Sequence, residues 1–272
     1  MIIDGKKIAE DIIQKLKTYP PTKKYLAVFL VGDDLSSLNF IAQKEKLAKI
    51  LKIDFRLYRY PQNITQDFLR KAIHQIGDKK NCGGVIVQLP LPKHINPEYV
   101  LNAIPKEKDI DVLGERALGS FYTGRSLVIP PACGVVEEIF NFTNFQIAEK
   151  KVAIVGVGRL VGKPILVWLL GKTKEIFVFN AGSDLSLISS SDLVICGVGK
   201  AHLISPSMLK KKAVVIDFGY DTDGKKIFGD FQVDEKLIQE LEISYTPTPS
   251  GTGPILVAKV FENFLKLNLE KN

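Results

Sequence analysis

The stretch Lys151-Val-Ala-Ile-Val-Gly-Val-Gly-Arg-Leu-Val-Gly162 decides the fold of the second half of this 272-residue chain. An apolar, β-branched run ends at Gly156, and further glycines follow at Gly158 and Gly162. Glycines let the backbone turn tightly and approach a pyrophosphate, while a helix beginning at Gly162 offers free N–H groups and the positive end of its dipole. The stretch therefore predicts a Rossmann-type strand, glycine loop and helix.

The type of dinucleotide is left open by the residues themselves. The glycine spacing is one residue longer than the commonest fingerprint, so a tight turn without a ligand is the competing interpretation. An NAD site usually places an acid at the end of the next strand, where it bonds the ribose hydroxyls. That predicted strand, Ile176–Phe179, ends in Asn180-Ala-Gly-Ser183, with neither an acid nor an arginine for a 2′-phosphate.

Outward from the glycine loop, apolar runs alternate with helical patterns. The expected strands are Tyr25–Val31, Phe55–Tyr58, Gly84–Gln88, Val152–Gly156, Ile176–Phe179, Leu193–Cys196 and Ala213–Phe218. The expected helices lie near residues 5–18, 36–51, 65–77, 131–142, 161–171 and 253–267. This alternation predicts an α/β fold with parallel sheets covered on both faces. Residues 89–131, rich in Pro, Gly and charge, predict a loop-rich stretch that is either functional or a domain junction, with the boundary near 120–130. Asp221-Thr-Asp-Gly-Lys predicts a hairpin turn.

Length and composition bound the class of protein. The chain is long enough for two domains, and its 46% apolar and 25% charged residues are typical of a soluble globular protein. No run approaches the roughly 20 apolar residues of a membrane span, and the N-terminus does not resemble a signal peptide. We therefore expect a cytoplasmic protein with no membrane partner. Its three cysteines should be reduced and buried, and should form neither disulfides nor a metal site: Cys82, Cys133 and Cys196.

The net charge of +7 suggests a polyanionic partner only weakly. The lysines are scattered along the chain without a basic block, so we expect a solvated surface and no nucleic-acid partner. A positive field that steers a polyanionic small molecule is the alternative.

One lysine falls on an apolar helix face. Ser36 or Ser37 is the expected N-cap of this helix. At about 100° per residue, the face that contains Lys44 also carries Phe40, Ile41, Leu47, Ala48 and Leu51. Burial lowers the pKa of an ammonium group and so prepares a lysine for acid–base chemistry. The alternative is a lysine that extends to solvent along its own stem.

Three other segments carry candidate site residues. Gln88 ends a predicted strand at the edge where active sites of α/β sheets gather, and it could bond Lys44 and favour the neutral amine. Asp109 and Asp111 could meet an amine-bearing ligand or form a solvated turn. The stiff, Pro- and Gly-rich segment from Tyr245 to Pro254 suits packing against a flat ligand or serves as an ordinary connector.

Six motifs in a fixed order together resemble one family, the bifunctional methylenetetrahydrofolate dehydrogenase/methenyltetrahydrofolate cyclohydrolases. The third of them matches the family's K-D-V-D-G. The motifs are Val31-Gly-Asp-Asp-x-x-Ser-x-x-Phe-x-x-x-Lys44, Val87-Gln-Leu-Pro-Leu-Pro92, Lys108-Asp-Ile-Asp111, Val155-Gly-Val-Gly-Arg-Leu-Val-Gly-Lys-Pro164, Val215-Ile-Asp-Phe-Gly219 with Gly229-Asp230, and Thr246-Pro-Thr-Pro-Ser-Gly-Thr-Gly-Pro254.

The resemblance implies a catalytic, folate-binding domain of residues 1–125 with 253–272 and a cofactor-binding domain of residues 126–252. It implies oxidation of 5,10-methylenetetrahydrofolate with NADP, hydrolysis of the methenyl product to 10-formyltetrahydrofolate, and a homodimer. It assigns catalysis to Lys44, Gln88 and Asp111. It assigns folate contacts to Phe40, Lys44, Val87, Gln88, Leu89, Asp111, Pro249, Ser250 and Gly251. It assigns cofactor contacts to Gly156, Val157, Gly158, Gly162, Gly182 and Tyr220.

Departures from the family pattern keep alternatives open. Phe40 stands where the family has a tyrosine, so a specialised homologue with one weakened activity is the second hypothesis. Val157, Gly158 and Ala181-Gly182 replace residues that help hold the 2′-phosphate, so NAD is possible beside NADP. The third hypothesis is a non-catalytic folate- or nucleotide-binding protein.

Overall fold

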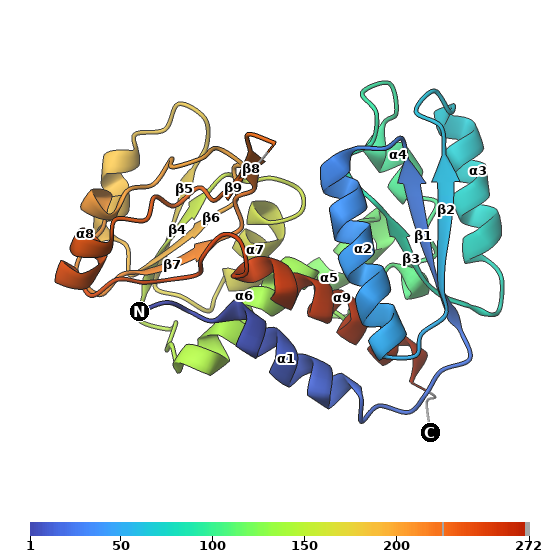
Figure 1. The fold of residues 1–272 in the computed structure, drawn as a ribbon, viewed down its shortest axis with the longest axis horizontal. Coiled ribbons are helices and arrows are strands. Elements are labelled where there is room, and N and C mark those ends of the chain that lie inside the picture. Colours follow the sequence, from blue (N-terminus) through green and yellow to red (C-terminus); the bar gives the residue numbers. More distant parts are fainter. Residues whose placement is uncertain (225, 270–272) are drawn as a thin grey trace. The chain divides into compact units, whose positions relative to one another are not determined.

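The computed structural model describes residues 1–224 and 226–269. The chain folds into two compact units, shown in Figure 1. The five-stranded unit consists of Met1–Ile12 and Ala132–Leu256, and the three-stranded unit of Ile13–Pro131 and the chain from Val257 onward. Both contain a parallel sheet with helical crossovers, so the predicted two-domain α/β fold class is confirmed.

The sheet of the three-stranded unit has β1 at its centre. Its strands are β1 (Tyr25–Val31), β2 (Phe55–Tyr60) and β3 (Cys82–Val87), in the order β2-β1-β3. The crossover helices are α2 (Leu35–Ile50) and α3 (Gln66–Gly77). Because the chain leaves β1 to one side and later returns to the other, the carboxyl ends of β1 and β3 form a switch point, where ligands bind in such sheets.

Burial of both faces explains the apolar strands. Every residue of β1 is buried, and alternate residues such as Ala27 and Phe29 pack with Leu69 and Ile73 of α3. Helix α9 (Thr252–Asn268) approaches β3 so closely that a Cβ on Gly84 would lie 2.8 Å from the Phe264 ring. A glycine is therefore required for this contact.

The sheet of the five-stranded unit has the order β10-β7-β6-β4-β5, with all strands parallel. The strands are β4 (Lys151–Val155), β5 (Glu175–Phe179), β6 (Leu193–Cys196), β7 (Val214–Asp217) and β10 (Ser244–Tyr245). The chain reverses its winding between β4 and β6, which places the glycine loop after β4 at the switch point. The predicted hairpin is confirmed as the antiparallel pair β8 (Asp221–Thr222) and β9 (Ile227–Phe228).

The segment over residues 89–131 is rich in loops, as expected, and it also contains three short helices. The segment contains α4 (Pro97–Leu101), the 3-10 helix η1 (Lys106–Lys108) and α5 (Glu115–Tyr122). Helix α4 is too short for a hydrophobic period to appear in the sequence, whereas α5 is amphipathic over its eight residues and sequence reasoning missed it. Tertiary burial of Leu101 and Ala117 stabilises both helices. The remaining elements are α1 (Gly5–Leu16), α6 (Pro131–Thr143), α7 (Gly162–Leu169), η2 (Leu185–Ser190), η3 (Pro206–Met208) and α8 (Glu235–Glu240).

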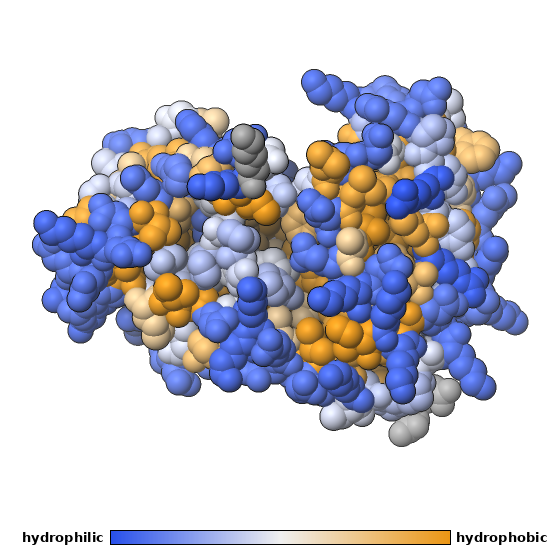
Figure 2. All heavy atoms as spheres, in the orientation of Figure 1, coloured by the Kyte–Doolittle hydropathy of each residue, from blue (hydrophilic) through white to orange (hydrophobic). Residues whose placement is uncertain are grey.

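The exposed surface combines hydrophilic and apolar side chains. On the face shown in Figure 2, hydrophilic residues cover much of both units, with apolar side chains exposed between them. Within residues 1–224 and 226–269, none of the helices is long and apolar enough to span a membrane. All three cysteines are buried and free, as predicted.

Candidate active site

Helix α2 carries Lys44 into the interior of the three-stranded unit. Asp34 is the N-cap, with its Oδ2 2.8 Å from the amide of Ser37, so the expected caps Ser36 and Ser37 are wrong. Asp34 caps the helix because its carboxylate accepts from the amide of Ser37, the third residue of the first turn. Lys44 is only 8% exposed, whereas Lys46 and Lys49 are exposed. The prediction of a buried lysine on the apolar face is confirmed, and Phe40 on the same helix is half-buried.

Gln88 follows the last residue of β3 and reaches Lys44. Lys44 Nζ donates to Gln88 Oε1 at 3.0 Å, while Gln88 Nε2 donates to the Leu89 carbonyl at 2.9 Å. The predicted contact is confirmed. The predicted effect needs correction, because burial lowers the pKa of Lys44 and an amide oxygen that accepts from Nζ does not favour the neutral amine.

Asp111 influences Lys44 through space. The carboxylate of Asp111 partly offsets the effect of burial on the pKa of Lys44. In turn, burial raises the pKa of Asp111, and the nearby Lys44 opposes that rise. Lys44 therefore combines a lowered pKa, a neutral hydrogen-bond partner and a carboxylate that acts from farther away, which suits a role in proton transfer.

The neighbouring carboxylate, Asp109, is fully buried, so a solvated turn is wrong for it. It is 1% exposed, and its Oδ2 accepts from the amides of Leu113 and Gly114 at 3.0 and 2.7 Å. Burial raises its pKa to about 7. Sequence reasoning missed this role because the two amides belong to a loop whose path the sequence does not show.

The other folate-contact candidates are divided between the units. Val87 is buried and Leu89 half-buried beside Gln88 in the three-stranded unit. In the five-stranded unit, Pro249 is exposed, Ser250 has φ of +83°, and Gly251 is buried. A Cβ on Gly251 would lie 2.4 Å from the Pro247 carbonyl oxygen, so the backbone of this segment is tightly folded.

The glycine loop has the geometry of a dinucleotide cradle. Gly156 has φ of +86°, and a Cβ on Gly162 would lie 1.9 Å from the Gly156 carbonyl oxygen, so neither position accepts a side chain. A Cβ on Gly158, in contrast, would meet nothing within 4 Å, and Val157 is half-buried. The loop therefore leaves open space at Gly158, before the N-terminus of α7.

Two further cofactor candidates follow two other strands of the same sheet. Gly182 follows β5, is exposed and has φ of +84°. Tyr220 follows β7 and is half-buried, and its carbonyl oxygen is 3.3 Å from a Cβ built on Gly199. Strand order thus gathers these loops at the same end of the sheet as the glycine loop.

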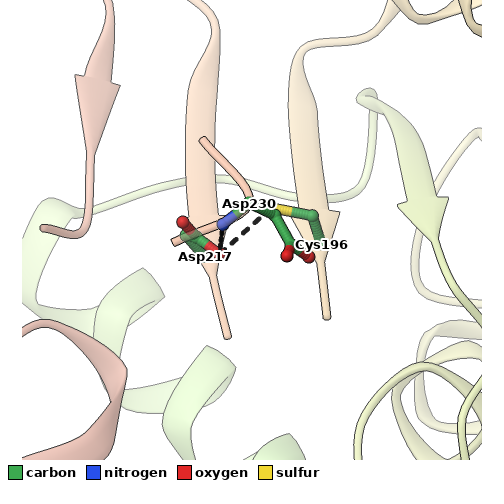
Figure 3. A group of neighbouring side chains, drawn as sticks. All are labelled: Cys196, Asp217 and Asp230. Atoms are coloured by element: carbon green, nitrogen blue, oxygen red, sulfur yellow. Dashed lines mark hydrogen bonds between the residues drawn. The ribbon is translucent and has the colours of Figure 1, made fainter. Parts of the chain in front are cut away.

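A buried cluster at the ends of β6 and β7 has the residue types of a metal site. It consists of Cys196, Asp217 and Asp230, whose ligand atoms lie within 4.8 Å of one another (Figure 3). Asp230 accepts from the amides of Val198, Gly199 and Lys200, at distances of 2.6 to 3.0 Å. Asp217 accepts from the amides of Gly219, Asp230 and Phe231, at distances of 2.6 to 3.3 Å.

These six N–H donors already satisfy the oxygens of the two carboxylates. The cluster therefore fits a structural role, in which two carboxylates hold the loops after β6 and β7 in place. Both aspartates belong to quoted sequence motifs, yet sequence reasoning assigned them no role. The available signal was a buried strand that ends in Asp217, two residues before Gly219.

Comparisons with known proteins agree with this architecture. A family model for the catalytic domain of tetrahydrofolate dehydrogenase/cyclohydrolase matches residues 3–111, and a model for the NAD(P)-binding domain matches residues 130–272. The bifunctional protein FolD of Mycoplasmopsis synoviae is 34% identical over 98% of this chain and 99% of its own length.

Solved structures extend the similarity to the fold. The bifunctional enzyme FolD from Campylobacter jejuni has a TM-score of 0.91 at 29% identity, covering 98% of both chains. The methylenetetrahydrofolate dehydrogenase-cyclohydrolase from Trypanosoma brucei, solved with NADP cofactor and inhibitor, has a TM-score of 0.90 at 25% identity and covers 98% of this chain and 96% of that one. With its buried Lys44–Gln88 pair and its glycine cradle, the chain belongs to the tetrahydrofolate dehydrogenase/cyclohydrolase family.

Proposed function

We propose that this protein oxidises 5,10-methylenetetrahydrofolate to 5,10-methenyltetrahydrofolate with a nicotinamide dinucleotide, and hydrolyses the product to 10-formyltetrahydrofolate. The observation that carries the proposal is the hydrogen bond between buried Lys44 and Gln88. It places an amine with a lowered pKa at a sheet switch point, in a family that performs these reactions.

Lys44 is the general acid and base of this proposal. Its lowered pKa increases the fraction of free amine near neutral pH, so the amine can take a proton from the water that attacks the methenyl carbon. Gln88 fixes the direction of Nζ through Oε1, and its own Nε2 is held by the Leu89 carbonyl. The amide therefore orients the lysine without supplying a counter-charge.

Asp111 is the proposed contact to the pterin ring. A carboxylate matches the paired N–H donors of a 2-amino-4-oxopterin, which gives both affinity and orientation. Lys44 opposes the rise in the pKa of Asp111 and so favours its ionised form. We propose that Phe40, Val87, Leu89, Pro249, Ser250 and Gly251 complete the folate site.

The proposed cofactor is NADP, with NAD possible. We propose Gly156, Val157, Gly158, Gly162, Gly182 and Tyr220 as its contacts, because their loops gather at one end of the sheet and the cradle accepts a phosphate. The bound nicotinamide supplies the hydride acceptor. We propose residues 126–252 as the cofactor domain and residues 1–125 with 253–272 as the catalytic domain. The compact units of the structure differ from these bounds, because Met1–Ile12 belong to the five-stranded unit, which otherwise runs from Ala132 to Leu256. We also propose a homodimer, to be checked by light scattering of the purified protein.

A side-by-side assay tests the proposal. Purified protein is given methylenetetrahydrofolate with NADP or with NAD, and formation of the methenyl product is followed by absorbance. Hydrolysis of methenyltetrahydrofolate is measured separately, without a dinucleotide. We expect turnover in both assays, and no product with either cofactor would reject the dehydrogenase.

Phe40 supports a second candidate, a homologue in which one activity is weakened. The half-buried ring on α2 lacks the hydroxyl that the family's tyrosine provides. If this loss limits the rate, Phe40→Tyr should raise kcat of the weaker activity several-fold, on the order of one added hydrogen bond. An unchanged kcat would argue against this candidate. Folate or nucleotide binding without turnover would indicate the non-catalytic binding protein instead.

A further inference from the structure

The loop from Asp109 to Gly114 joins η1 to α5 and carries Asp111 near its middle. Its entry is fixed by three contacts within the three-stranded unit. Asp109 forms an isolated parallel bridge with Val85 of β3. Lys108 Nζ donates to the carbonyls of Gly77, the last residue of α3, and Lys79, just beyond it. Asn263 Nδ2 of α9 donates to the Ile110 carbonyl at 2.8 Å.

The exit of the loop is fixed by a side chain from its own beginning. Asp109 Oδ2 accepts from Leu113 N at 3.0 Å and from Gly114 N at 2.7 Å, while Oδ1 has no hydrogen-bond partner in the described part of the chain. Hydrogen bonds from amides to a carboxylate are stronger than those between neutral groups. The Asp109 carboxylate thus links the beginning of the loop to its end, and Asp111 lies between the linked residues.

The backbone of the loop between Asp109 and Gly114 is strained at Val112. Val112, next to Asp111, has φ of +56°, a region that β-branched residues rarely adopt, and the K-D-V-D-G pattern has glycine there. The Val112 side chain is 1% exposed and packs with Ala117 and Val128. Such a conformation persists only where the surroundings hold it, and the amides bonded by Asp109 belong to the two residues that follow Val112.

We propose that Asp109 is a positioning residue: its carboxylate holds the strained loop that directs Asp111 toward Lys44 and the pterin. The proposal rests on the proposed function of Asp111. Asp109 itself is too buried to touch the substrate and already accepts two amides, so it acts through Asp111. Burying a carboxyl group removes its hydration and costs free energy. The hydrogen bonds that Asp109 accepts in return fix the shape of this loop.

A double-mutant cycle separates positioning from general stabilisation. The variants are Asp109→Ala, Asp111→Ala and the double variant, and the probe is the Kd for tetrahydrofolate by calorimetry. We expect Asp109→Ala to weaken binding about tenfold, within the range of coupled neighbours, and the double variant to equal Asp111→Ala within about twofold. Asp109→Asn keeps the shape and an acceptor oxygen, so it should bind within about threefold of wild type.

Controls keep the result decisive. Asp192→Ala removes a carboxylate that holds the Lys151 amide at 2.8 Å in the five-stranded unit, and should leave the Kd for tetrahydrofolate unchanged. Asp109 borders a pocket of about 190 Å³, so alanine extends an existing cavity. If that variant does not fold, Asp109→Ser takes its place, because a hydroxyl is too short to bond both amides.

The outcomes are distinguishable. Additive losses in the cycle, or a folded Asp109→Ala protein with wild-type affinity, would overturn the positioning role. Wild-type protein that binds tetrahydrofolate without turnover would reject the proposed function, while the cycle in Kd still decides the role of Asp109. Wild-type protein that does not bind tetrahydrofolate would overturn both.

Discussion

Among the described residues of the three-stranded unit, two lysines are buried, and they differ in what faces them. Lys44 on α2 is 8% exposed and bonds a neutral amide, with no carboxylate within ion-pair distance among the described residues. Lys259 on α9 is 3% exposed and forms an ion pair with buried Glu262. Lys266 also reaches Glu262, at 2.9 Å.

The partner of each buried lysine determines whether its amine suits acid–base chemistry or a structural ion pair. Burial alone would raise the pKa of Glu262, but its hydrogen bonds from Lys259 and Lys266 outweigh burial and the pKa is lowered. Glu262 therefore remains the anionic partner of Lys259. Lys44 lacks such a partner, so burial lowers its pKa and leaves an amine that can exchange protons. Both lysines are buried, and they differ in the Glu262 carboxylate that pairs with Lys259.

Lys44→Met should have the largest effect. Loss of a general acid–base group typically costs about 10²- to 10⁴-fold, so we expect kcat of methenyltetrahydrofolate hydrolysis to fall by about 10³-fold. The protein should remain folded, because methionine suits the apolar face. Hydrolysis is measured alongside circular dichroism, and a folded variant that retains wild-type kcat would contradict the role of Lys44.

Gln88→Glu should make Lys44 resemble Lys259. A carboxylate in place of the amide oxygen, 3.0 Å from Nζ, would stabilise the ammonium form and raise the pKa of Lys44. Each unit of increase lowers the free amine about tenfold, so we expect kcat at pH 7 to fall about 10- to 100-fold and to recover at higher pH. Gln88→Ala is the control, since it removes the contact without adding charge. Equal pH profiles for the two variants would refute this explanation.

Lys259→Met should destabilise the protein while sparing catalysis. Breaking a buried ion pair typically costs about 3–5 kcal/mol, and the remaining contact with Lys266 favours the lower end of that range. We therefore expect the free energy of unfolding in urea to fall by about 3 kcal/mol, with kcat within about twofold of wild type. Lys44→Met is the matched comparison, and a larger loss of stability in that variant would reverse our assignment.

The pH dependence of stability should show the smallest difference. The folded pKa of Lys44 lies below its ordinary value of 10.5, so the unfolded state binds more protons between the two values. Wild-type stability should therefore rise with pH toward 10.5, relative to Lys44→Met, which lacks this group. Urea unfolding at several pH values measures the difference. A flat difference would mean that the pKa of Lys44 is not lowered.

Local patterns in the sequence determined much of this protein. Strand–helix alternation, the glycines after Val155 and the apolar face around Lys44 each depend on neighbours within one element, so their periodicity is visible along the chain. The ordered motifs added the family, including Asp111 as a site candidate. Sequence reasoning missed α4, whose five residues do not establish a period, and also α5, whose amphipathic pattern lies in a segment rich in Pro, Gly and charge.

Only the tertiary structure decided which groups meet. The order β2-β1-β3 brings Gln88 to Lys44, 44 positions earlier in the chain. The burial of Asp109 against the Leu113 and Gly114 amides depends on the path of a loop. The amides around Asp217 and Asp230 depend on strands β6 and β7 lying side by side. These contacts join segments whose spacing in sequence carries no period, so only the folded backbone specifies them.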